Sequence, residues 1–135
     1  MRLLLDSNIF LEILLEQEKA EEAKLLLRRV EEHEFYLSDY GLHSIGLALF
    51  RRKKHNAFRQ FVNEMLIDAG IGLLSLGAED LGAVASASEK FNLDFDDAYQ
   101  VSIAHKHELK IVSLDSDFDR TERGRLTPAQ LLSDA

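Results

Sequence analysis

The sequence contains no cysteine, only one proline and no long hydrophobic run, and each of these absences narrows what the protein can be. Without cysteine the chain has no disulfides, no thiolate metal ligands and no cysteine nucleophile, which is compatible with a reducing cytosol. Apolar runs such as residues 3–5 and 25–27 are far short of the roughly 20 residues that a membrane-spanning helix needs. The single proline, Pro128, marks no linker. We therefore expect one domain over residues 1–135, in a soluble, cytoplasmic protein with no membrane association.

Positive charge is also scarce. The chain has 16 basic and 24 acidic residues, a formal net charge of −8. A polyanion gains no general attraction to such a surface, so any contact with nucleic acid must be local, and the balance argues against a sequence-reading DNA-binding protein. With 46% hydrophobic residues in 135, the chain can bury a core of ordinary size.

Four apolar segments have the pattern of β-strands, and helical segments separate them. The strands are expected at residues 2–5, 34–38, 71–76 and 110–114. Helices are expected at residues 9–30 (two helices or one bent helix), from 39 to the basic run at 51–55, and at 58–66, 81–91, 96–107 and from 128 onward. Strands that alternate with helices indicate a three-layer α/β/α sandwich with a mostly parallel central sheet.

Three aspartates are expected at the edge of the sheet where parallel sheets bind their ligands. Asp6 and Asp115 each follow an apolar strand, and Asp97 lies in the first turn of the helix before the last strand. Ligands of open parallel sheets bind beyond the carboxyl ends of the strands. Carboxylates so close together repel one another unless a cation, basic groups or a proton offsets their charge. Oxygen ligands favour Mg²⁺ or Mn²⁺, which can activate water and stabilise charge on a phosphodiester.

Each acid also has a purely structural interpretation. Asp94 and Asp97 fit a helix cap followed by an acid in the first turn, and Asp115 or Ser116 can cap the turn that follows. Asn8 can cap the first helix. We favour a joint site because independent caps need not gather at the ends of apolar strands.

The three acidic motifs resemble those of the PIN domain, the fold of many ribonucleases and of VapC-type toxins. The motifs are Leu-Asp-Ser-Asn at residues 5–8, Asp-Ala at 97–98 and Ser-Leu-Asp-Ser-Asp-Phe at 113–118, and the match covers nearly the whole chain. The resemblance implies that Asp6, Asp97 and Asp115 hold Mg²⁺ or Mn²⁺ and carry the cleavage of single-stranded RNA. It also implies that the chain forms a homodimer and that an antitoxin is its protein partner.

The resemblance extends to the residues around these acids, with one departure. It implies that Asp117 is a companion acid and a further candidate metal ligand, that Ser113 is the small polar residue near the site, and that Asn8 supports the first aspartate. The family usually carries a glutamate on the helix after the second strand, where this chain has Ser44. Asp94, one turn before the second motif, is our first candidate to supply the lost charge.

Asp39 is a weaker substitute for the missing glutamate, because it should lie more than a turn from Ser44.

Basic residues that could bind RNA phosphates fall in two groups. Arg51, Arg52 and Lys53 form the dense basic run, although the helix dipole also favours cations at a helix end. Arg120 and Arg123 follow the last acidic motif and lie nearer the expected site.

Two functions remain open, and a third is disfavoured. The first is a metal-dependent endoribonuclease that cleaves single-stranded RNA, as the toxin of a toxin–antitoxin pair. The second is a catalytically weakened or inactive relative that serves as an RNA-binding or protein-interaction module, with Ser44 marking the loss of chemistry. Phosphoryl-aspartate chemistry is disfavoured because residues 6–8 lack the second aspartate of the phosphatase pattern and no lysine follows a late strand.

Overall fold

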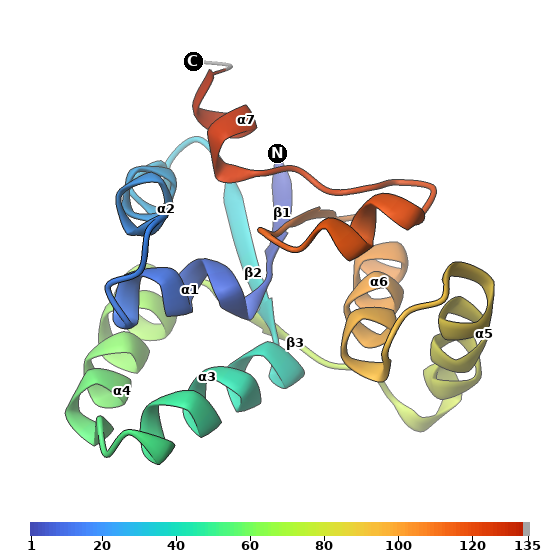
Figure 1. Ribbon diagram of the computed structural model, residues 1–135, viewed down its shortest axis with the longest axis horizontal. Coiled ribbons are helices and arrows are strands. Elements are labelled where there is room, and N and C mark those ends of the chain that lie inside the picture. Colours follow the sequence, from blue (N-terminus) through green and yellow to red (C-terminus); the bar gives the residue numbers. More distant parts are fainter. Residues whose placement is uncertain (134–135) are drawn as a thin grey trace.

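The computed structural model describes residues 1–133, and its centre is a sheet of four parallel strands in the order β3-β2-β1-β4 (Figure 1). The strands are β1 (Arg2–Leu5), β2 (Glu34–Ser38), β3 (Gly72–Leu74) and β4 (Lys110–Val112). Strand β1 pairs with β2 on one side and with β4 on the other, Leu4 lying opposite Tyr36 and Ile111. This arrangement confirms the predicted α/β class with a parallel central sheet.

The apolar run that follows Arg2 is central because helices cover both of its faces. Leu3 and Leu5 are fully buried in one hydrophobic cluster, and Leu4 is fully buried in a second cluster. The first cluster includes residues of α1 (Ser7–Leu14), α2 (Ala20–Leu27), α3 (Asp39–Arg51), α4 (His55–Phe61) and α7 (Pro128–Ser133). The second includes residues of α5 (Leu81–Phe91) and α6 (Phe95–His107). These two clusters are the two outer interfaces of the predicted three-layer sandwich.

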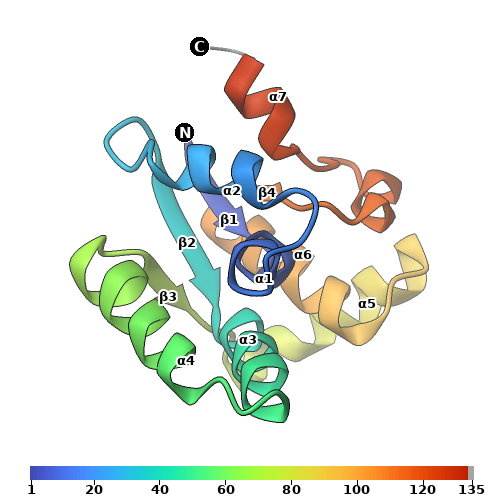
Figure 2. The same cartoon turned by 60° about the vertical axis from the view of Figure 1, so that its left-hand side comes forward.

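Short helical segments complete the described chain. A π-helical segment, η1 (Val62–Asp68), continues α4. A 3₁₀ segment, η2 (Ala78–Asp80), precedes α5, and a second one, η3 (Ser116–Arg120), follows β4. Figure 2 shows α4 beside β3 at one edge of the sheet. None of the helices within residues 1–133 is long and apolar enough to cross a bilayer.

Capping residues explain several helix boundaries. Ser38 Oγ accepts a hydrogen bond of 2.8 Å from the Gly41 N–H, so Ser38 caps α3. Thr127 and Gln130 exchange the two hydrogen bonds of a capping box at the start of α7. Helix α5 ends at Asn92, whose φ of 53° is left-handed, as predicted.

The structure decides between the alternatives for residues 9–30, which form two helices because the chain leaves α1 through Glu16 at a left-handed φ of 53°. Other sequence predictions were wrong in detail. Asp94 occupies the N-cap position of α6 but makes no side-chain capping hydrogen bond. Strand β4 ends at Val112, before the predicted limit of 114, because Ser113 Oγ accepts a hydrogen bond from the Asp115 N–H and turns the chain.

Replacement of Leu4 by alanine should lower the free energy of unfolding by about 3–5 kcal/mol, because it opens a cavity at the centre of the sheet. Leu73→Ala is the matched control, since Leu73 lies on β3 and is 48% exposed, and it should cost less than about 1 kcal/mol. Urea denaturation measures both changes. Equal losses in the two variants would contradict the placement of β1.

Candidate metal centre

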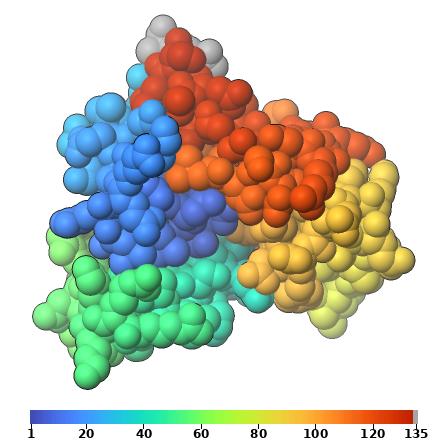
Figure 3. Space-filling model, in the orientation of Figure 1, coloured from blue at the N-terminus to red at the C-terminus, as the bar shows by residue number. Residues whose placement is uncertain are grey.

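A polar cavity of about 210 Å³ lies where β1 and β4 end and where α1, α3 and α6 begin. Figure 1 shows the N-terminal ends of α3 and α6 on the side of the sheet at which β1 ends. In Figure 3 the surface of the residues after β4 adjoins that of the first residues of the chain. The cavity is lined by Asp6, Ser7, Asn8, Tyr40, Gly41, Ser44, Asp96, Asp97, Gln100 and Asp115.

Asp6 is held by two polar neighbours that the sequence also singled out. Its Oδ2 accepts hydrogen bonds from Ser113 Oγ at 2.7 Å and from Asn8 Nδ2 at 3.2 Å. Asn8 Oδ1 in turn accepts from the Leu114 N–H at 3.3 Å, which ties the start of α1 to the segment after β4. Asn8 therefore does not act as a helix cap. Burial raises the pKa of the Asp6 carboxyl, and the hydrogen bond from Ser113 opposes that rise.

Asp97, Asp115 and Asp117 form the tightest acidic group. One carboxylate oxygen from each lies within 4.8 Å of the others. Asp97 comes from the first turn of α6, Asp115 directly precedes η3, and Asp117 lies within η3. Asp115 Oδ1 also accepts a hydrogen bond of 2.9 Å from the Asp117 N–H, so it caps η3 as the structural interpretation predicted.

Burial and the surrounding acids raise the pKa of Asp97 to about 7. Burial is the largest cause, followed by the negative charges of Asp115, Asp6 and Asp117 and then of Asp94. Without a cation, these carboxylates cannot all be ionised at neutral pH without strong repulsion. The separation of the oxygens suits one ion, because oxygens bound to a single Mg²⁺ or Ca²⁺ lie at most about 4–5 Å apart.

Gln100 belongs to this cavity, and sequence reasoning missed it. The side chain is 4% exposed, and its Oε1 is buried without a hydrogen-bond partner among the described residues. A buried amide oxygen without a partner is costly, so a ligand or water in the cavity would satisfy it. Its position three residues after Asp97, on the same face of α6, was the available signal. The donor set of carboxylate and amide oxygens fits a hard divalent cation.

Ser44 lies on the cavity wall at the position where the resemblance implies a glutamate. Its Oγ donates a hydrogen bond of 3.1 Å to the Tyr40 carbonyl oxygen, so it brings no charge to the cavity. Asp39 does not replace that charge, because its carboxylate accepts hydrogen bonds from the Tyr99 hydroxyl and the Tyr40 N–H and lies outside the cavity lining. Asp94 is exposed beside the cavity and adds to the charge that Asp97 feels.

The predicted basic residues are scattered. Arg120 is the nearest to the acids, with an ion pair of 3.0 Å to Asp117 Oδ1. Arg51 ends α3, so about 18 Å of helix separates the basic run from the start of α3 at the cavity, and Arg52 and Lys53 follow it on the surface. Arg123 lines a different cavity.

Several solved structures share this fold, and one of them is described as a toxin–antitoxin complex. A toxin–antitoxin complex from Klebsiella pneumoniae aligns with a TM-score of 0.70 and 17% identity, over 93% of this chain and 96% of that one. FitAcB from Neisseria gonorrhoeae aligns with a TM-score of 0.70 and 20% identity, over 94% and 98%. VapBC-1 from nontypeable Haemophilus influenzae aligns with a TM-score of 0.72 and 13% identity, over 96% and 99%. At these identities the likeness shows the fold.

Comparison with curated proteins found no match. Comparison with protein families matched residues 3–124 to the PIN domain, which spans all three acidic motifs. The match covers most of the chain and confirms the resemblance drawn from the sequence. The chain therefore belongs to the PIN domain family.

Proposed function

We propose that this PIN domain is a metal-dependent endoribonuclease that cleaves single-stranded RNA. The observation that carries the proposal is the convergence of Asp97, Asp115 and Asp117 within 4.8 Å. Asp97 and Asp115 line the same small cavity as Asp6. Four carboxylates so placed require a compensating charge, and PIN domains are generally dependent on divalent metals. A bound Mg²⁺ or Mn²⁺ would activate a water molecule and stabilise charge on the phosphodiester.

The contacts of the acidic residues indicate different roles for them. Asp97, Asp115 and Asp117 hold the cation through their clustered oxygens. Asp6 adds negative charge at a fixed orientation, because Ser113 and Asn8 hold its carboxylate.

Gln100 completes the polar lining from one turn further along α6. Its Oε1 has no hydrogen-bond partner among residues 1–133 and would accept a hydrogen bond from a water molecule in the cavity.

We further propose that the protein is the toxin of a toxin–antitoxin pair and forms a homodimer in the cytoplasm. The likeness of the fold to a protein described as a toxin–antitoxin complex supports the first part. Two exposed apolar side chains on α3, Leu47 at 41% and Phe50 at 50% exposure, support the second, because a partner surface would cover them.

A second candidate is the non-catalytic module, which the neutral Ser44 on the cavity wall favours. In that case the remaining acids would be too few to hold the ion at physiological concentration. The two candidates differ in a measurable property, namely the affinity of the natural protein for Mn²⁺.

The purified protein should bind Mn²⁺ and cleave unstructured RNA, and Asp97→Asn should reduce both by about 100-fold, because it removes a carboxylate from the cluster. Calorimetry and a gel assay measure the two effects. Asp68→Asn is the control, since Asp68 is exposed at the end of η1 and makes the same chemical change elsewhere. Cleavage that survives in Asp97→Asn would indicate a contaminating nuclease and sink the proposal.

In the presence of EDTA, Asp97→Asn should stabilise the protein. The folded pKa of Asp97 is raised to about 7 from 3.8, so its ionisation destabilises the fold above pH 7, and this effect disappears as the pH falls toward 4. The gain should be on the order of 1–2 kcal/mol at pH 8 after solvent screening, and near zero at pH 4. Thermal unfolding at the two pH values measures it, with Asp68→Asn unchanged. A gain of equal size at both pH values would contradict the repulsion.

Ser44→Glu should increase the affinity for Mn²⁺ about tenfold, because it adds a carboxylate to the cavity wall. Ser44→Gln is the control of matched size without charge. If the natural protein already binds Mn²⁺ and the variant binds it more tightly, the nuclease proposal stands. Binding seen only in Ser44→Glu would instead favour the non-catalytic module.

A further inference from the structure

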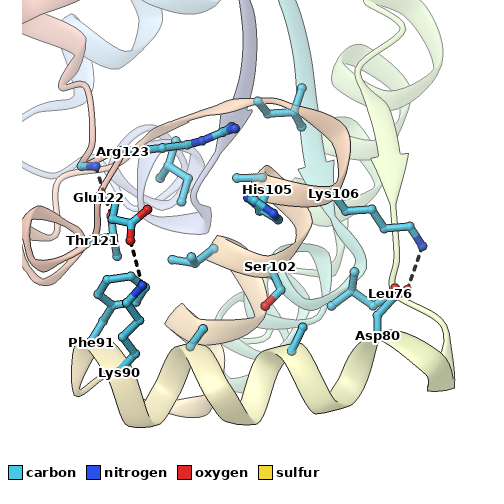
Figure 4. Close-up of a pocket in the computed structure, with 17 residues that line it drawn as sticks. Leu76, Asp80, Lys90, Phe91, Ser102, His105, Lys106, Thr121, Glu122 and Arg123 are labelled. Atoms are coloured by element: carbon cyan, nitrogen blue, oxygen red, sulfur yellow. Dashed lines mark hydrogen bonds and ion pairs between the residues drawn. The ribbon is translucent and has the colours of Figure 1, made fainter.

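A second cavity, of about 450 Å³, lies between α5, α6 and the loop at residues 121–124 (Figure 4). It shares no lining residue with the acidic cavity. Its wall is mostly apolar and made of small or aliphatic side chains, among them Ala83, Ala87, Val101, Ala104, Leu109 and Ile111. An apolar cavity of this size is typical of small-molecule sites, which range over roughly 300–1,000 Å³.

Two ion pairs lie at opposite ends of this cavity (Figure 4). At one end Lys90 of α5 pairs with Glu122 at 2.8 Å, and at the other Lys106 of α6 pairs with Asp80 at 2.7 Å. Each pair joins two elements of the wall. A continuous peptide chain would have to pass these pairs, whereas a short molecule fits between them.

Two further basic side chains line the cavity, namely Arg123 and His105, and the latter contributes to the lowered pKa of the Glu122 carboxyl after the larger effect of Lys90. Neither His105 nor Arg123 makes an ion pair or a side-chain hydrogen bond with any residue in the described range 1–133. The chain as a whole carries a net charge of −8, so an excess of basic groups around one apolar cavity is a local exception. Because Glu122 and Asp80 are already neutralised by their lysines, the uncompensated charge is positive.

We propose that this cavity binds a small amphiphilic carboxylate. The apolar body of the ligand lies against α5 and α6 between the two ion pairs, and its carboxylate is held by the Arg123 guanidinium with His105 as a second donor. A guanidinium suits a carboxylate because its planar donors make two parallel hydrogen bonds. The site does not depend on the nuclease activity, since none of its residues lines the acidic cavity.

The test is calorimetric titration of the full chain with sodium decanoate below its micellar concentration. Three ligands separate recognition of the carboxylate from recognition of the apolar body, and decanoate should bind. Butyrate has the same carboxylate but little apolar body, and decyltrimethylammonium has the same apolar body but the opposite charge. Both should bind at least about tenfold more weakly than decanoate. Failure of decanoate to bind at millimolar concentration would overturn the proposal. Equal affinity for decyltrimethylammonium would also overturn it, because it would show an apolar site without charge recognition.

Variants locate the binding within the molecule. Arg123→Gln should weaken decanoate binding at least about tenfold, while Arg28→Gln, which removes the same charge from the exposed end of α2, should leave it unchanged. Ala87→Phe should abolish binding by filling the cavity, and circular dichroism establishes whether that variant folds. Should it not fold, the pair of arginine variants still decides the question. Undiminished binding in Arg123→Gln would place decanoate elsewhere and overturn the proposal.

Discussion

Repulsion among carboxylates at the ends of β1 and β4 is the constraint around which the acidic cavity is built. The fold holds these groups together because their backbones are fixed: β1 is buried on both faces, and Ser113 and Asn8 hold Asp6 from two directions. Burial, together with this repulsion, raises the pKa of Asp97 to about 7. Groups so arranged cost stability in the absence of a cation, and this is why we connect them with metal binding rather than with structure alone.

Ser44 gives the acidic cavity less negative charge than a glutamate would, but the cluster of aspartates remains. A glutamate there would add a negative charge, which strengthens the hold on a cation and increases repulsion without one. The serine hydroxyl is instead turned to the Tyr40 carbonyl oxygen. The side chain of Asp117, although ion-paired with Arg120, brings a third oxygen into the cluster with Asp97 and Asp115. In the proposed site these three oxygens would hold the ion.

The two cavities have opposite character because different elements build them. The acidic cavity lies where helices begin and strands end, so polar groups converge there. The larger cavity lies along the sides of α5 and α6, where alanines leave space between the helices and ion pairs cross at the ends. Helix α6 contributes to both: its first turn carries Asp97, and its later turns carry Ala104 and His105.

The order of strands and helices, the parallel sheet and the acids at strand ends were all predictable, because apolar runs, helical periodicity and capping residues act locally along the chain. Asp6, Asp97 and Asp115 were found in this way. Helical spacing from Asp97 was the one signal that Gln100 faces the same cavity. Nothing in the sequence indicated that Asp39 is diverted to Tyr99, or that Arg123 lines a separate apolar cavity with His105. Those outcomes depend on side chains from distant segments packing together, and only the tertiary structure decides which of them meet.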